Sequence, residues 1–230
     1  MQISIIIPTL NEADNIGRLI HYLKNNADAT LFEIIVVDAD SHDDTEGVAR
    51  CAGATTVLKS LRGRAVQMNL GAQAAKGDVL YFIHADCTPP ASYCADIQQF
   101  IKEGYPLGCY RSRFDKEGIM LKINAYFTRF SPLWCRGGDE TLYVTRAVFD
   151  DLNGYDTYYS IMEEYDFIKR AREKFSFKII PKDVVVSARK YETNSWLRVM
   201  WANFMVFRMF KKGVEPEVLG KTYKTMLIYR

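Results

Sequence analysis

Three short apolar runs in this chain each end in polar or acidic residues, and this arrangement constrains the fold most strongly. The runs cover residues 4–8, 32–37 and 79–83, and they lead into Thr9-Leu10-Asn11-Glu12, Asp38-Ala39-Asp40-Ser41 and His84-Ala85-Asp86. Short runs rich in Ile and Val between helical patterns are typical of buried parallel strands. Ligands of open α/β sheets bind outside the carboxyl ends of such strands, so we expect the carboxylates there to converge on one rim. These carboxylates are Glu12, Asp38, Asp40 and Asp86.

Carboxylates that crowd one rim repel each other unless a cation lies among them. Hard divalent cations prefer oxygen ligands and bind through a few carboxylates together with substrate phosphates. The pattern therefore predicts a metal-assisted site for a phosphorylated ligand.

The composition indicates a globular protein without a case for nucleic-acid binding. Of the 230 residues, 48% are hydrophobic and 25% charged, which suits one large domain, and the net charge is only +2. The five cysteines show no CxxC spacing, so we expect reduced thiols and neither a disulfide framework nor a zinc site. No apolar run reaches the ~20 residues of a membrane span. We expect a cytoplasmic protein, with the cytoplasmic membrane surface as an alternative location.

Helical periodicity between the apolar runs predicts strand–helix alternation through about the first 100 residues. Helices are expected over residues 12–27, 43–51, 65–75 and 91–103, with Asn11 as an N-cap and a further strand over 54–58. This is a doubly wound α/β pattern. The second half is less regular, with strands expected over 107–114, 142–144, 177–180 and 184–186 and helices over 120–130 and 164–173.

The segment over residues 195–212 is rich in aromatic residues and Met, with Arg and Lys between them. Three interpretations stay open. It packs on the domain as core, it lies on a membrane surface as an interfacial helix, or it forms a dimer contact.

Several segments, in their order, resemble the family 2 glycosyltransferases. They are SIIIPTLNEADNI, IIVVDADSHDDT, AAKGDVLYFIHAD, GGDETLYVTRAVFDDLNGYD and IMEEYDF. Together with GRAVQMNLGA and SARKYE they are similar to a bacterial subgroup of small, stand-alone members. The resemblance implies the GT-A fold, a Rossmann-like α/β domain with a mixed, mostly parallel central sheet. It implies a glycosyltransferase domain over residues 1–194, with a nucleotide-binding half to about residue 105 and an acceptor half over 106–194. A C-terminal helical extension follows over 195–230.

The resemblance also implies a nucleotide-diphosphate-sugar donor, expected to be linked to UDP. The residues expected to hold it are Pro8, Thr9, Asn11, Glu12, Asp38, Asp40, His84, Ala85, Gly138 and Asp139. Arg64 and Arg189 are cationic candidates for the diphosphate. Alternatives stay open: helix capping for Asn11 and Glu12, an exposed turn for Asp40, and a plain loop or solvated surface for Gly138 and Arg64.

The motif His84-Ala85-Asp86 stands where the family carries its Asp-x-Asp metal motif, and its first position is His. The resemblance implies that Asp86 binds Mg²⁺ or Mn²⁺ between protein and donor. Imidazole tolerates Mn²⁺ better than Mg²⁺, so we favour Mn²⁺ as the activator. His84 is then either a second metal ligand or a structural residue.

Met162-Glu163-Glu164 falls where the family usually has Glu-Asp, whose Asp deprotonates the acceptor hydroxyl. Glu164 occupies the Asp position and is the expected general base, with Glu163 as the alternate. Both could equally be carboxylates at a helix N-terminus, where the dipole favours them.

These features predict a hexosyltransferase with a metal-dependent, inverting mechanism and a lipid-linked or small-molecule acceptor. The alternative is a non-catalytic nucleotide-sugar-binding module, which the departures at His84 and Glu164 would favour. A nucleotidyltransferase is disfavoured, because PTLNE replaces the glycine-rich basic loop expected after its first strand.

Overall fold

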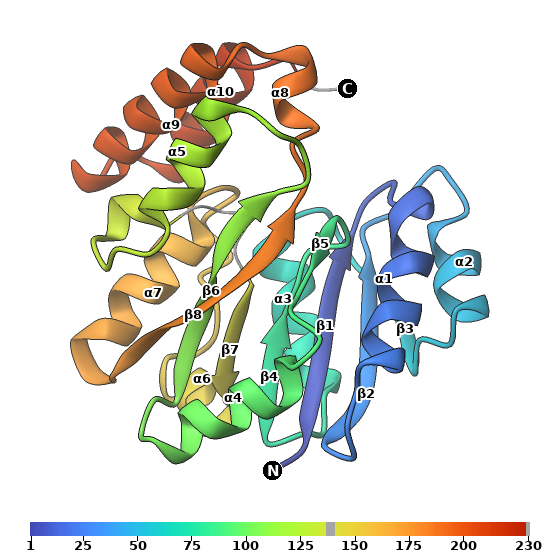
Figure 1. Ribbon diagram of the computed structural model, residues 1–230. Coiled ribbons are helices and arrows are strands. Elements are labelled where there is room, and N and C mark those ends of the chain that lie inside the picture. Colours follow the sequence, from blue (N-terminus) through green and yellow to red (C-terminus); the bar gives the residue numbers. More distant parts are fainter. Residues whose placement is uncertain (137–140, 229–230) are drawn as a thin grey trace.

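The computed structural model describes residues 1–136 and 141–228. Within these residues one eight-stranded sheet has the order β3-β2-β1-β4-β7-β6-β8-β5 (Figure 1). All strands run parallel except β7 and β5, which are antiparallel to their neighbours. The predicted mixed, mostly parallel sheet is therefore confirmed. The strands are β1 Ile3–Thr9, β2 Leu31–Asp38, β3 Thr56–Lys59, β4 Val79–Phe82, β5 Cys87–Thr88, β6 Leu107–Phe114, β7 Leu142–Thr145 and β8 Phe177–Val186.

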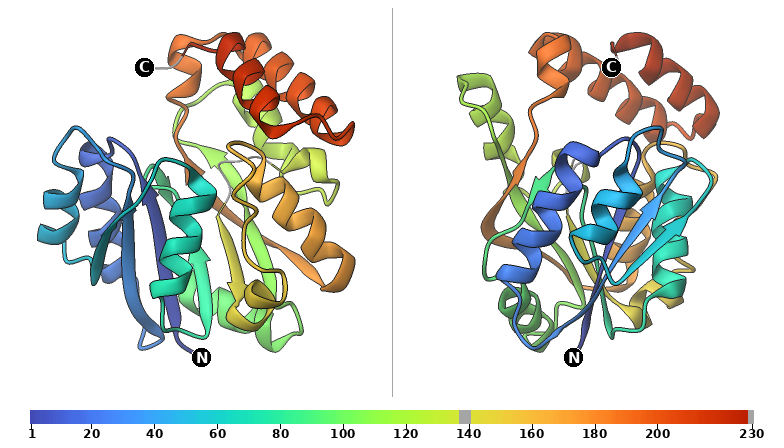
Figure 2. Two further views of the ribbon diagram at one scale, coloured as in Figure 1. Left: turned by 180° about the vertical axis from the view of Figure 1, so that it is seen from behind. Right: turned by 90° about the vertical axis from the view of Figure 1, so that its right-hand side faces the viewer.

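Helices cover both faces of the sheet (Figure 2). Successive side chains of a strand point to opposite faces, and β1 shows this directly. Ile5 belongs to a buried cluster with side chains of α1, α2 and α4, whereas Ile6 belongs to a second cluster with α3, α6 and α7. The helices of this part are α1 Ala13–Asn25, α2 Thr45–Cys51, α3 Arg64–Ala74, α4 Tyr93–Lys102, α5 Ile119–Phe127, α6 Arg146–Asp151, α7 Glu163–Lys174 and α8 Lys190–Thr193. A short 3₁₀ helix, η1, covers Leu133–Cys135.

The carboxyl ends of β1, β2 and β4 meet at one end of the sheet, as the apolar runs predicted. Thr9 and Asp38 are register partners in β1 and β2. The backbone nitrogen of Ile83, directly after β4, donates to the carbonyl of Ile6 in β1. The polar segments that follow these strands are therefore brought to one rim.

The structure corrects the predicted cap of the first helix. The N-cap of α1 is Glu12, without a side-chain cap hydrogen bond, rather than Asn11. Asn11 has a left-handed backbone with φ of 55°, and its side-chain oxygen accepts from the backbone nitrogen of His42 at 2.8 Å. The amide side chain thus joins the loop after β1 to the loop after β2, instead of capping its own helix.

The two strands predicted over 177–180 and 184–186 form one strand, β8, with an irregularity in its pairing with β6. Tyr110 pairs with Ile180 but the next residue, Arg111, pairs with Asp183. Proline has no backbone N–H to donate to a strand ladder, so Pro181 fits at this irregularity. The sequence gap between the two apolar stretches was therefore a bulge rather than a strand boundary.

Two helices form the C-terminal extension, α9 Trp196–Lys211 and α10 Pro216–Met226. They share a small buried cluster of Val199, Ala202 and Leu227, separate from the clusters of the sheet. Tyr165 of α7 contacts the ring of Phe207, with centroids 5.7 Å apart. Core packing therefore accounts for part of α9. No helix among the described residues is long and apolar enough to cross a membrane.

Candidate active site

A cleft of about 800 Å³ opens at the carboxyl ends of the strands. It collects most of the residues predicted from the sequence, and its lining includes Pro8, Thr9, Asn11, Glu12, Arg64, His84, Ala85, Asp86, Glu163, Glu164 and Arg189. Asp38 and Asp40 lie outside this lining. Gly138 and Asp139 fall outside the described residues, so their predicted sugar contacts stay predictions.

Asp38 is buried at the end of β2 and ties two loops together. Its Oδ1 accepts from Thr9 Oγ1 at 3.0 Å and from Ser41 Oγ at 2.6 Å, and its Oδ2 accepts from the Ser41 backbone nitrogen at 2.8 Å. A carboxylate with this many donors stabilises the loop conformation around it. Asp40 is exposed and has a left-handed backbone with φ of 60°. Left-handed residues outside glycine are uncommon and concentrate at functional sites.

The side chain of Gln67 connects the ends of β1 and β2 beneath the site, and the sequence analysis did not predict this role. Its side chain is buried in α3, and Nε2 donates at 2.8 Å both to the Thr9 carbonyl and to the Val37 carbonyl. One amide therefore holds the ends of β1 and β2 at a fixed separation. The available signal was a glutamine inside a helix whose other buried residues, such as Met68 and Gly71, are apolar or small, because a buried polar residue needs a hydrogen-bond partner.

Arg189 supplies a cation to the carboxylates of the rim. Its Nη2 lies 2.6 Å from Glu12 Oε1 and 3.2 Å from Asp86 Oδ2, and its Nη1 donates to Glu12 Oε2 at 3.2 Å. The two-pronged contact with Glu12 is the geometry that guanidinium groups favour with carboxylates. The repulsion expected among these carboxylates is thus relieved in part by a side chain from the segment after β8.

The two candidate bases lie in the first turn of α7 and are both buried. Glu164 Oε1 is 3.2 Å from His84 Nε2, and Glu163 Oε1 is 3.3 Å from Arg64 Nε. The second oxygen of each carboxylate, Oε2, is buried without a hydrogen-bond partner among the described residues. Burial raises the pKa of Glu164, and the hydrogen bond from His84 opposes part of that rise. A buried carboxylate with an elevated pKa in a cleft is a candidate acid–base group.

The residues after β4 fit a divalent cation through Asp86 alone. No group of three or more His, Cys, Asp or Glu side chains among the described residues could hold a metal ion without help. One carboxylate suffices for Mg²⁺ or Mn²⁺ when substrate phosphates and water complete the coordination. Asp86 lines the cleft and could supply that carboxylate. His84 makes its contact with Glu164 instead, so its role as a second metal ligand stays a prediction.

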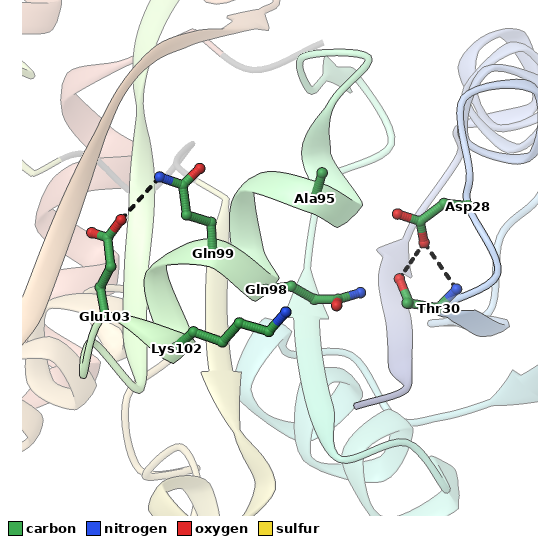
Figure 3. A pocket seen from close by; sticks show the side chains of 7 residues that line it. All are labelled: Asp28, Thr30, Ala95, Gln98, Gln99, Lys102 and Glu103. Carbon is green, nitrogen blue, oxygen red and sulfur yellow. Dashed lines mark hydrogen bonds between the residues drawn. The ribbon is translucent and has the colours of Figure 1, made fainter.

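Figure 3 shows a second hollow, of about 460 Å³, between α4 and the residues just before β2. Its polar groups pair locally. Gln99 donates to Glu103 at 2.9 Å, and the Thr30 backbone nitrogen donates to Asp28 at 2.8 Å. It lies at the amino end of β2, away from the rim on which the loops converge, so the chemistry belongs to the cleft.

The strand order and the cleft at the strand ends define the class. This is a GT-A fold, in which a Rossmann-like half is joined to a mixed sheet. The chain matches glycosyl transferase family 2 over residues 4–170. It therefore belongs to that family, which confirms the resemblance and the enzyme class predicted from the sequence motifs.

Curated relatives cover part of the chain. A glucosyl-3-phosphoglycerate synthase of Mycolicibacterium paratuberculosis is 34% identical over 98 residues, which is 38% of this chain and 29% of that protein. A dolichol-phosphate mannosyltransferase of Pyrococcus furiosus is 32% identical over 123 residues, 51% of this chain and 35% of that protein. The chain thus spans about a third of the length of these relatives.

Solved structures share the fold over nearly the whole chain. The glucosyl-3-phosphoglycerate synthase of Mycobacterium tuberculosis, in complex with Mn²⁺, UDP and its product, has a TM-score of 0.62 and 22% identity, over 93% of this chain and 80% of that one. A mannosyltransferase of Pyrobaculum calidifontis in complex with GDP-mannose and Mn²⁺ has a TM-score of 0.66 and 19% identity, over 92% and 64%. At these identities the likeness confirms the GT-A fold.

Proposed function

We propose that this chain is a metal-dependent glycosyltransferase that moves a sugar from a nucleotide diphosphate donor to an acceptor hydroxyl with inversion. One observation carries the proposal. The same cleft holds a buried carboxylate of raised pKa, Glu164, and a cation–carboxylate pair, Arg189 with Asp86. An acid–base group beside a diphosphate-binding pair is what sugar transfer to a hydroxyl requires.

The donor would lie along the rim. The guanidinium of Arg189 offers several donors in a planar fork and suits the diphosphate oxygens. To reach them it would exchange part of its contact with Glu12 and Asp86 for contact with the donor. Asp86 would hold a Mn²⁺ or Mg²⁺ ion, which when bound supplies Lewis-acid neutralisation of the leaving nucleoside diphosphate.

Glu164 would take the proton of the acceptor hydroxyl as that oxygen attacks the anomeric carbon. A general base needs a pKa near the working pH and must reach the proton that it removes. Burial moves the pKa of Glu164 in that direction. His84 Nε2 pairs with Oε1 at 3.2 Å, which leaves Oε2 as the oxygen without a partner in the described structure. A single displacement of this kind inverts the anomeric configuration and needs no covalent enzyme intermediate.

The nucleotide is chosen by analogy with the fold relatives. Two of these were solved with UDP or GDP-mannose and Mn²⁺. UDP is our default, in line with the family resemblance, and Asp38 is the proposed contact of the base. Direct contact would require Asp38 to share its carboxylate between the donor and the hydrogen bonds from Thr9 and Ser41.

The first test is the thermal stability of the purified protein with nucleoside diphosphates and nucleotide sugars, each with and without Mn²⁺. A ligand that binds only the folded state raises the melting temperature. A rise that needs both one nucleotide and the metal is the expected result. No rise with any nucleotide would refute the donor site.

Turnover separates the enzyme from a non-catalytic binding module. We expect the wild type to hydrolyse the bound donor, even if slowly. We expect Glu164→Gln to bind the donor but to lose this hydrolysis. A metal-dependent rise in melting temperature without any turnover would favour the binding module. The departures from the family pattern at His84 and Glu164 are the observation that keeps this alternative open.

A further inference from the structure

Two segments far apart in sequence present large apolar side chains to solvent at the end of the molecule that carries the C-terminal helices. We call the exposed side chains of residues 119–134 and of α9 the α5–α9 surface. Its most exposed members include Ile119, Trp134, Leu197, Trp201 and Phe204, with exposed fractions of 77%, 57%, 72%, 58% and 52%. Figure 1 and both views of Figure 2 place α5 and α9 at this same end, and the right-hand view of Figure 2 shows them on opposite sides of it.

These side chains are not part of any core. None of the residues of α5 is buried, although the helix is strongly apolar. In α9 the buried residues are Val199, Ala202 and Val206. Leu197, Trp201 and Phe204 follow one another at helical spacings of four and three, so they form a separate stripe on the solvent side. Contiguous exposed apolar patches often mark an interaction surface.

The charged residues within the two segments of the α5–α9 surface have one sign. Residues 118–136 and 195–214 contain no Asp or Glu, although the chain has 28 acidic residues among its 230. The exposed cations of these segments are Lys122, Arg129, Arg198, Arg208, Lys211 and Lys212. An acidic neighbour, Glu117, pairs with Lys122 at 2.5 Å. The remaining positive charge would attract an anionic partner.

We propose that the α5–α9 surface docks this protein onto a bilayer with anionic phospholipid headgroups. Aromatic and aliphatic side chains flanked by Lys and Arg suit an interfacial helix, which lies in the membrane surface without crossing it. Trp rings in particular favour the headgroup level. A second copy of the chain fits less well, because a symmetric contact through this surface would bring the cations of both copies together.

The inference rests on the proposed function for the role of the cleft, and within that function it favours an acceptor carried on a lipid. Asn203 and Val206 of α9 and Tyr223 of α10 also line the cleft. Docking through α9 therefore places the cleft beside the headgroups, where an acceptor carried on a lipid would be within reach.

The test is co-sedimentation of the purified protein with vesicles at low salt. Vesicles of phosphatidylcholine alone are compared with vesicles that also contain phosphatidylglycerol. We expect at least tenfold stronger partition onto the anionic vesicles, and a weaker one at high salt. Tryptophan fluorescence gives a second readout, because two of the three Trp residues, Trp134 and Trp201, lie in the surface. Their emission should shift to shorter wavelength on docking.

A triple variant, Leu197→Ser, Trp201→Ser and Phe204→Ser, should lose at least tenfold in partition. These side chains are exposed, so folding should survive, and an unchanged donor-induced rise in melting temperature checks this. The matched control is Phe32→Ser, an exposed apolar residue at the amino end of β2, which should bind vesicles like the wild type.

Three results would overturn the proposal. They are no binding of the wild type to anionic vesicles, equal binding of the triple variant, or a dimer in solution that the triple variant dissociates. Loss of the donor response in a protein that still binds vesicles would instead refute the proposed function alone.

Discussion

The isosteric change Glu164→Gln should stabilise the protein while it removes the proposed base. The Glu164 residue is only 5% exposed, and within residues 1–136 and 141–228 its Oε2 has no hydrogen-bond partner. A buried polar group without a partner costs about 1–3 kcal/mol, and a carboxylate is harder to bury than an amide. The amide oxygen of Gln can still accept from His84 Nε2. We expect a gain of about 1–2 kcal/mol at neutral pH, or roughly 2–8 °C in melting temperature for a chain of this size.

The gain should depend on pH in a definite direction. Burial raises the pKa of Glu164 above its ordinary value of 4.5, so the unfolded chain ionises at lower pH than the folded one. Well below that value both states hold the proton, and the carboxylate does not affect stability. As pH rises above 4.5 the unfolded chain ionises first, and the free energy of unfolding falls until the pH exceeds the raised folded-state pKa of Glu164. The advantage of Glu164→Gln should therefore be small near pH 4 and larger at neutral pH.

Thermal unfolding followed by circular dichroism at the two pH values measures this difference. The control is Glu173→Gln, the same substitution at an exposed position in the last turns of α7, which should change stability by no more than about 0.5 kcal/mol. The reasoning is refuted if Glu164→Gln melts at or below the wild-type temperature at neutral pH. It is equally refuted if the gain is the same at both pH values.

Four further substitutions test the site and the packing beneath it. Asp86→Asn should abolish the part of the donor-induced rise in melting temperature that needs Mn²⁺. Arg189→Gln should weaken the apparent affinity for nucleoside diphosphates by tenfold or more. Unchanged titrations of either variant would contradict the role proposed for that residue. Gln67→Ala removes two buried hydrogen bonds and should cost about 2–4 kcal/mol in urea unfolding, together with weaker donor binding. Gly71→Ala would place a Cβ 2.5 Å from the Ile6 side chain. We therefore expect overpacking to lower the free energy of unfolding by about 1–3 kcal/mol. A urea midpoint equal to that of the wild type would show instead that α3 can shift freely.

Several features of the fold could be read from local pattern alone. The Ile- and Val-rich runs predicted β1, β2 and β4 to within two residues of their ends, because buried parallel strands need continuous apolar sequence. Parallel strands joined by helices place their carboxyl ends on one rim, so the position of Glu12 and Asp86 in the cleft followed as well. These features depend on hydrophobic burial, which acts on every residue of a run.

The partners of the site residues could not be read in this way. Arg189 meets Glu12 across 177 positions of sequence, and His84 meets Glu164 across 80. Each such contact depends on how α7 and α8 pack against the sheet and on the rotamers of the side chains that meet. A change of one residue in the β8 irregularity would alter where Arg189 lies. The amino-acid sequence by itself determined which chemistry stands at the strand ends. Only the tertiary structure decided which carboxylate is paired with a cation and which is buried beside a histidine, because pairing depends on separations of a few ångströms between segments that are distant in the chain.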